Sequence, residues 1–475
     1  MKALDIKEVS KYIIMFVIMG IFFVIPPFEP LTAKGMQYIG IFLACLFGWS
    51  ALNTTIVSVL GLVALCFAEG MTMAGVLAGS FGQPNVMLMI LLFIFVDICR
   101  RENLAEWIAG FILSRPFLKG KPIMFSAAIL VVTTILGIIQ SYLALLLMWN
   151  VVYAICNEFN IKPKDKYSIV MLVGVALFAS IGLVTLPFQD SGLILTGLYW
   201  SMTGTAINYL HYLLVMLPIQ GALIALWILG SKYILHVDFD RLANVDKTDM
   251  YQKITKRQTA CLWLIALLVA LFLFTNNAPA EWAITQLLQR MTVFGLSFIV
   301  LFVASIWYVD GKPMLNFPES ARDGILWNIM FLVAIMMFFA SNLCAADTGV
   351  TALIIQYLAP VLNNLSPWVF MMLVLFVTFV LTNLINNIVV GSVIISLLVP
   401  LTAVIDFNLP AVVTLIILIC SYAMLTPASC GTSPLVYGNS EWIDIPTMYK
   451  CIIPLMVIGL IFTLTIGLAW AVFIF

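Results

Sequence analysis

The sequence predicts an all-α polytopic membrane protein with about 11 transmembrane helices and two re-entrant helical hairpins, arranged as an inverted-repeat transporter. Three observations support this prediction: an apolar composition, apolar runs of bilayer-spanning length, and segregated basic residues. Of the 475 residues, 63% are hydrophobic and 9% are charged, and the mean hydropathy is +1.13. A soluble globular domain needs more surface charge than this. Segments 12–25 and 452–475 approach or exceed the ~20 residues that cross a bilayer.

The distribution of Lys and Arg orients the chain, because these residues collect on the cytoplasmic side of a membrane. They gather mainly in segments 2–11, 100–121, 162–166, 232–257 and 312–322, and at Lys450. None occurs between Arg322 and Lys450. We therefore expect a multi-pass protein of the cell (plasma or inner) membrane, with a cytoplasmic N-terminus and an extracytoplasmic C-terminus.

The first half of the chain divides into a scaffold and a first repeat. Residues 1–85 are expected to form scaffold spans at 11–27, 35–50 and 54–69. Residues 86–235 are expected to form the first repeat, with spans at 86–100, 167–201 and 206–235. Between these spans, the apolar stretch 122–158 has basic residues at both ends. A single crossing would place one basic cluster outside, so this stretch is predicted to be a hairpin that enters and leaves from the cytoplasm.

The second half repeats this plan in the opposite orientation. A charged cytoplasmic loop is expected at 236–257, followed by scaffold spans within 258–323, at 258–275 and 292–309. Residues 324–475 form the expected second repeat, with spans at 324–345 and 409–437 and a last span that ends outside. The stretch 366–404 is too long for one helix and lacks basic flanks, as an outside-facing hairpin should. Two oppositely facing hairpins are typical of the inverted repeats of secondary transporters.

Two spans contain helix-breaking and small polar residues at mid-membrane depth. They read "SIGLVTLPFQDSGLIL" (180–195) and "AMLTPASCGTSPLVYG" (423–438), with Pro187, Gly192, Pro427, Gly431 and Pro434. Proline and glycine interrupt the helical hydrogen-bond ladder, and backbone freed at this depth is tolerated only inside protein or along a cavity. Matched breaks in two halves indicate a transport site. The alternative is a pair of proline kinks whose serines and threonines bond back into the helix.

Each break is expected to face the tip of its own hairpin. The first tip carries Gln140, Ser141 and Tyr142, and the second carries Thr382, Asn383, Asn386 and Asn387. Asn386 or Asn387 is suited to cap the returning helix by accepting its first amide hydrogens. A helix N-terminus favours an anion, whereas freed carbonyls and Asn or Ser oxygens favour a hard cation such as Na⁺.

At these residues the sequence resembles the divalent anion:sodium symporter (DASS) family of the ion transporter superfamily. The family's second hairpin carries Thr-x-x-x-Ser-Asn-Thr, to which "TNLINNI" (382–388) is similar, with Asn387 retained. The segment "ASIG" (179–182) matches the first broken helix, and 422–438 resembles the second. The chain departs at Tyr142 and Ile388, which replace the hydroxyl residues of the family's two Ser-Asn-Thr motifs. The resemblance implies an elevator-type homodimer that moves dicarboxylates with Na⁺.

Asp190 is the distinctive substitution near the first break. A carboxylate in a bilayer is costly, so it is a functional candidate that binds Na⁺ or carries a coupled proton; the alternative is a cap for the second half of the span. The predicted substrate-binding residues are Gln140, Ser141, Tyr142, Ser191, Gly192, Thr382, Asn383, Asn386, Asn387, Ser429, Gly431 and Thr432. The predicted coupling residues are Thr185, Gln189, Asp190, Asn387, Thr426 and Cys430. Asp97 is instead expected to pair with Arg100 and Arg101.

These observations predict a secondary active transporter of a small organic anion, of the di- or tricarboxylate class, coupled to Na⁺ or H⁺ or working by exchange. A cation/proton antiporter or an inorganic oxyanion permease of the same superfamily is the alternative. No enzyme is expected, because the sequence has no HExxH motif, no P-loop and no aspartate pair of intramembrane proteases. The nine cysteines are single and the two histidines far apart, so no cofactor or metal centre is predicted. The zero net charge argues against nucleic acid partners.

Overall fold

The computed structural model describes residues 6–187, 190–247, 252–279, 281–343, 345–362, 365–384, 386–427 and 429–475. It is helical throughout, apart from a two-stranded antiparallel ribbon of β1 and β2. The helices of the first half are α1 (Ile6–Val24), α2 (Ala33–Ala51), α3 (Thr54–Leu65), α4 (Met73–Gly79), α5 (Pro84–Arg101), α6 (Leu104–Leu113), η1 (Pro116–Leu118), α7 (Pro122–Ile139), α8 (Ser141–Glu158), α9 (Lys166–Leu183), α10 (Asp190–Thr203), α11 (Tyr209–Tyr233) and η2 (Asp240–Leu242).

The elements of the second half are α12 (Lys256–Asn277), α13 (Ala283–Ile306), β1 (Tyr308–Val309), β2 (Lys312–Pro313), α14 (Phe317–Gly324), α15 (Trp327–Asn342), η4 (Ala346–Thr348), α16 (Val350–Leu362), α17 (Pro367–Thr382), α18 (Asn387–Leu401), α19 (Leu409–Ser421), α20 (Ser433–Gly438), α21 (Ile445–Phe462), η5 (Thr463–Gly467, a π-helical turn) and α22 (Leu468–Ile474).

Local capping explains where many of these helices begin. The Thr32 hydroxyl accepts the Gly35 N–H at the start of α2, and Asn53 Oδ1 accepts two amides at the start of α3. Helix α12 begins with a reciprocal capping box of Thr255 and Gln258. Such side chains satisfy amide hydrogens that have no partner within the helix.

The two expected hairpin segments are each a pair of helices separated by a short break. Helices α7 and α8 cover 122–158, with Gln140 between them, and α17 and α18 lie within 366–404. Helix α7 crosses α9 at a close contact that requires glycine. A Cβ at Gly182 would lie 2.1 Å from the Thr134 carbonyl oxygen, and one at Gly137 would lie 2.5 Å from the Ala179 carbonyl oxygen.

The spans expected at 167–201 and 409–437 are also broken. Helix α9 ends at Leu183 and α10 begins at Asp190, while α19 ends at Ser421 and the short α20 begins at Ser433. The span expected at 292–309 is longer than predicted, because α13 begins at Ala283 and bends at Thr292, where φ is 57°. Helix α14, which precedes the span expected at 324–345, is polar.

Within the described residues, five helices are long and apolar enough to cross a membrane, or up to seven if two bent helix pairs each count as one span. The five are α7, α9, α11, most of α12, and the continuous run from α21 to α22. Shorter apolar helices include α17, α18 and α19. Because the helix pairs and the broken spans divide the apolar segments into helices too short to be counted as spans, the number of eleven crossings stays a prediction.

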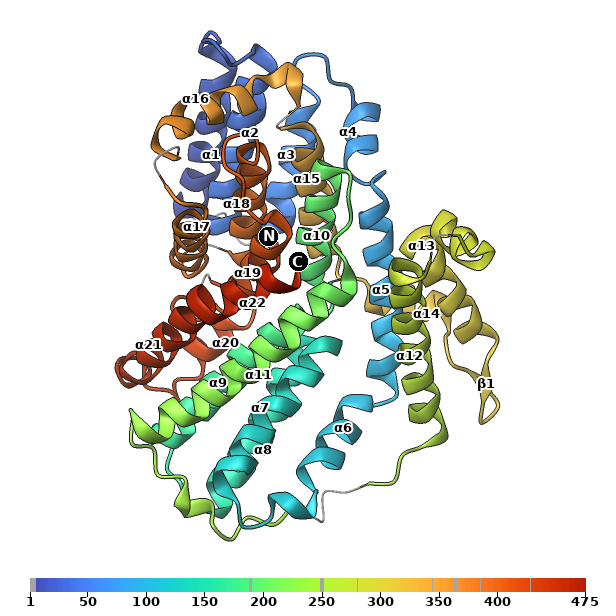
Figure 1. Ribbon diagram of the computed structural model, residues 1–475, viewed down its shortest axis with the longest axis vertical. Coiled ribbons are helices and arrows are strands. Elements are labelled where there is room, and N and C mark those ends of the chain that lie inside the picture. The colour runs from blue at the N-terminus through green and yellow to red at the C-terminus, as the bar shows by residue number, and fades with distance from the viewer. Residues whose placement is uncertain are drawn as a thin grey trace.

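The helices pack around two hydrophobic cores, and α1, α2 and α16 lie at one end of the molecule while α7, α8 and α9 lie toward the other (Figure 1). Helices α1 to α4 share a hydrophobic core with α15 and α16. A larger core joins α5 to α13 with α17, α19, α21 and α22. Helix α10 packs against both α15 and α18, which brings the first broken span next to the second hairpin.

Candidate functional site

The tip of the second hairpin is built by its asparagines. Asn386 Oδ1 accepts the Ile388 and Val389 N–H groups at 3.1 and 3.4 Å, so the predicted N-cap of the returning helix α18 is confirmed. Asn387 Oδ1 accepts the Ile388 N–H at 2.9 Å. Because both amide oxygens accept backbone hydrogens, the amino group of each asparagine is left as a donor.

The tip of the first hairpin differs from that of the second in the capping of its returning helix. Helix α8 begins at Ser141, and Gln140 at the N-cap position is extended, with φ −163° and ψ 123°. No side chain among the described residues caps this helix. Gln140 therefore does not cap α8 as Asn386 caps α18.

The first break is held by residues of α11. The Tyr212 hydroxyl donates to the Val184 carbonyl at 2.6 Å, which satisfies an acceptor that the end of α9 leaves free. The Thr185 hydroxyl donates to Gln220 Oε1 at 3.0 Å. Gln189 lies outside the described residues, as does the side chain of Asp190 at the start of α10.

The second break is held by tyrosines and by the second hairpin. The hydroxyls of Tyr437 and Tyr449 both donate to the Leu425 carbonyl, at 2.6 and 2.9 Å. Asn383 Oδ1 accepts the N–H groups of Met424 and Leu425, each at 3.0 Å. The buried Thr382 hydroxyl donates to the Cys420 carbonyl at 3.3 Å. Thr382 and Asn383 thus tie the hairpin to the break.

A cavity of about 450 Å³ lies where the two hairpin tips and the two breaks converge. It is lined by nine of the predicted site residues, namely Gln140, Ser141, Tyr142, Ser191, Asn386, Asn387, Cys430, Gly431 and Thr432. The structure does not place the predicted residues Gly192, Thr382, Asn383, Ser429, Thr185 and Thr426 on its wall. Sequence reasoning missed the polar lining residues Thr54, Ser180 and Ser421, and the apolar ones Leu183, Leu326, Ile329, Leu332 and Ile388.

The cavity is polar but carries no formal charge on the described part of its wall. No Lys, Arg, Asp or Glu is among the described lining residues. Five helices present their N-terminal residues to it: α3 through Thr54, α8 through Ser141, α10 through Ser191, α15 through Leu326 and α18 through Asn387. Each N-terminus carries partial positive charge, which favours an anion, whereas the ends of α9 at Leu183 and of α19 at Ser421 bring partial negative charge to the same wall.

Polar side chains on the cavity wall join α9 to the second break. The Ser180 and Thr432 hydroxyls lie 2.8 Å apart, and Thr432 Oγ1 lies 3.2 Å from Cys430 Sγ. In contrast, the buried hydroxyls of Ser191 and Thr426 have no hydrogen-bond partner among the described residues. One such hydroxyl belongs to each break.

Tyr142 brings the first hairpin into contact with the second break. A Cβ at Gly431 would lie only 2.4 Å from the Tyr142 hydroxyl oxygen. Glycine is therefore needed at 431 for the phenol to occupy this place.

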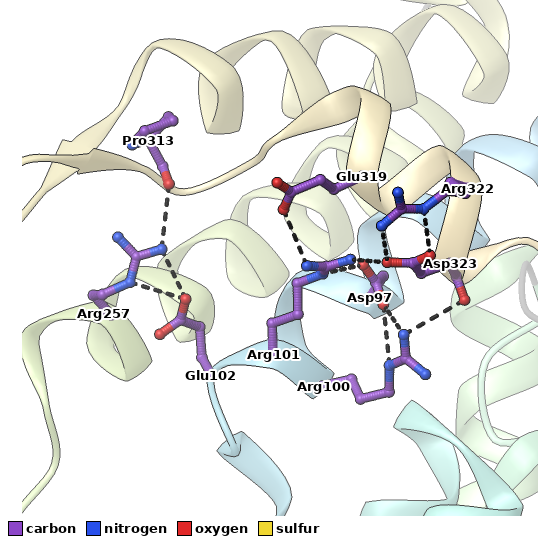
Figure 2. Close-up of polar contacts among 9 residues, drawn as sticks. All are labelled: Asp97, Arg100, Arg101, Glu102, Arg257, Pro313, Glu319, Arg322 and Asp323. Carbon is purple, nitrogen blue, oxygen red and sulfur yellow. Dashed lines mark hydrogen bonds and ion pairs between the residues drawn. The ribbon is translucent and has the colours of Figure 1, made fainter.

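A cluster of charged residues lies at the end of α5 (Figure 2). The Asp97 carboxylate is fully buried and pairs with both Arg100 and Arg101, which confirms the expected ion pair. Arg101 also reaches Glu319 and Asp323 on α14, at 3.2 and 3.0 Å. The described residues contain no group of three or more His, Cys, Asp or Glu that could hold a metal ion.

Comparison with known proteins adds a family and a fold. The family model described as "Citrate transporter" matches residues 44–420 of the chain. Among solved structures, the YdaH transporter of Alcanivorax borkumensis is similar, with a TM-score of 0.58 and 13% sequence identity. The match covers 92% of this chain and 98% of that one. No curated relative matches the sequence.

Proposed function

The chain belongs to the citrate transporter family, and on this premise we propose that it carries a small organic anion of the di- or tricarboxylate class. Family and fold make it a multi-pass membrane carrier of anions rather than an enzyme, and they bear out the resemblance to the anion symporters. The family indicates no cofactor. The substrate class and the coupling belong to the proposal.

The cavity at the hairpin tips supports this substrate class. The side-chain oxygens of Asn386 and Asn387 accept backbone N–H groups, so the amino groups of these two lining residues are left as donors. Amino groups and helix N-termini donate hydrogen bonds and accept none, which suits a carboxylate. The volume of about 450 Å³ falls in the range of small-molecule sites.

We assign the coupling to a cation to the two breaks. The unpaired hydroxyl of Ser191 lies at the first break, next in sequence to Asp190, which is predicted to bind Na⁺ or to carry a proton, and that of Thr426 lies at the second break. Both hydroxyl and carboxylate oxygens are ligands suited to a hard cation. The eleven crossings and the cytoplasmic N-terminus, which rest on the apolar segments and the basic residues, and the elevator movement and the homodimer, which rest on the family resemblance, complete the proposal.

The test replaces Asn387 with aspartate in the purified protein. The Asn387→Asp variant keeps the oxygen that accepts the Ile388 N–H but turns the donor into a second, anionic acceptor. We expect the variant to fold and to lose the thermal stabilisation that di- and tricarboxylates give the parent protein. At a ligand concentration 100 times Kd, that stabilisation is about 2.7 kcal/mol.

The matched control is Asn408→Asp, which makes the same change at another helix start. Asn408 Oδ1 accepts the Ala411 N–H at the start of α19, and Asn408 is not among the residues that line the cavity. This variant should bind as the parent protein does. Carboxylate binding that survives Asn387→Asp would refute the site. Proton-driven Na⁺ flux without any organic substrate would favour the antiporter alternative.

A further inference from the structure

A second, smaller chamber lies against the cavity. It has a volume of about 70 Å³ and is bounded by α5, the start of α15 and the tip of the first hairpin. Six residues line both spaces, namely Gln140, Ser141, Tyr142, Leu183, Leu326 and Ile329. The hairpin tip is thus the partition between the cavity and this chamber.

The far wall of the chamber is formed by Asp97, Arg100 and Asp323. Arg100 is the only basic residue in the described lining of either space. Its Nε and Nη2 groups donate to Asp97 Oδ1, and Nη2 also reaches the Asp323 carbonyl at 3.5 Å. No described residue accepts a hydrogen bond from Nη1, and 42% of the side chain is exposed (Figure 2).

The two carboxylates beside Arg100 are already neutralised. Asp97 is 0% exposed, and its two oxygens are taken by Arg100 and Arg101. Hydrogen bonds from Arg322 and then Arg101 hold the pKa of the Asp323 carboxyl below its usual range, so it stays ionised and paired. An anion that enters the chamber therefore meets the unused donors of the guanidinium rather than a free carboxylate.

We propose that this chamber is the passage between the cavity and the charged end of α5, and that Arg100 receives the carboxylate of the substrate there. This rests on the proposed transport of an organic anion. The chamber as it stands has room for a carboxylate group but not for a whole di- or tricarboxylate. Passage therefore requires the tip at Gln140–Tyr142 to move away from α5 and α15.

The experiment compares Arg100→Gln with Arg101→Gln in proteoliposome uptake of a di- or tricarboxylate. Each variant removes one of the two arginines that pair with Asp97, but only Arg100 lines the chamber in the described part of the chain. For Arg100→Gln we expect kcat/KM to fall about tenfold and its dependence on ionic strength to flatten, because a steering charge is lost. Arg100→Lys should restore both in part, while Arg101→Gln should keep the parent's ionic-strength dependence.

Equilibrium binding separates this inference from the proposed function. Arg100 does not line the cavity. The ligand concentration that gives half of the maximal thermal stabilisation should therefore be the same for Arg100→Gln and for the parent protein. Equal losses of kcat/KM in the Arg100 and Arg101 variants, or no loss in either, would overturn the inference and leave the proposed function standing. A parent protein that binds no carboxylate would overturn the proposed function first.

Discussion

The contact between Tyr142 and Gly431 gives a prediction with a magnitude set by geometry. An alanine Cβ at 431 would lie 2.4 Å from the Tyr142 hydroxyl oxygen, whereas ordinary contacts begin at 3.4 Å. The phenol must therefore move by about 1 Å (3.4 − 2.4) or swing into the cavity. Because the φ of Gly431 lies outside the left-handed region, the substitution acts through this clash and not through backbone strain.

We expect Gly431→Ala to cost about 1–3 kcal/mol of stability, as overpacking does, and to lower kcat/KM for uptake. A displacement of about 1 Å at a positioned group can cost up to about 100-fold. The assay is initial uptake into proteoliposomes, with thermal unfolding of the same preparations. Tyr142→Phe should restore the Gly431→Ala protein in part, because the next ring atom, Cζ, lies 3.2 Å from the new methyl group, a tight contact that a small shift of the ring relieves.

A double-mutant cycle makes the reasoning refutable. The single variant Tyr142→Phe measures what the hydroxyl contributes by itself, so the cycle isolates the clash. A coupling energy near zero between the two positions would show that the phenol does not occupy this place. Parent-like uptake by Gly431→Ala would also refute the role given to the contact.

Two further predictions concern the packing and the breaks. Gly182→Ala should destabilise the protein by about 1–3 kcal/mol in thermal unfolding, because its Cβ would lie 2.1 Å from the Thr134 carbonyl oxygen. The control Gly221→Ala on α11 should leave stability unchanged, because no atom lies within 4 Å of the new Cβ. Ser191→Ala and Thr426→Val remove unpaired hydroxyls, so they should leave stability without Na⁺ unchanged or raised, and should reduce any stabilisation by Na⁺. Loss of stability in the absence of Na⁺ would contradict the second prediction.

The helix pairs and the broken helices around the site could be predicted from the sequence. They depend on segment length and on local proline and glycine rather than on long-range packing. Apolar stretches that are too long for one helix and too evenly flanked for one crossing predict hairpins, as α7–α8 and α17–α18 illustrate. Proline and glycine at mid-membrane depth predict broken helices, and both breaks lie at the expected segments. A local rule, the place of an asparagine just before a helix, predicts Asn386 or Asn387 as the cap, and the structure shows that it is Asn386.

The roles of the other polar residues depend on contacts that no local rule contains. Asn383 and Asn387 are four residues apart on one hairpin, yet one accepts amides of the second break and the other faces the cavity. Ser180 reaches the cavity wall only because α9 packs against α19 and α20. The "ASIG" segment that contains Ser180 was recognised, but no sequence signal showed which way its hydroxyl points.

The two hairpin tips differ in the chemistry that they bring to the cavity. The second hairpin offers the amino groups of Asn386 and Asn387, whereas the first offers a phenol that rests against Gly431. A symmetric pair of tips would accept a substrate in either orientation. With amide donors at one tip and Tyr142 at the other, we expect the proposed carboxylate substrate to place a carboxylate on the amides. Because Tyr142 also borders the chamber at Arg100, the end of the substrate opposite the amides is the one that leads through the passage.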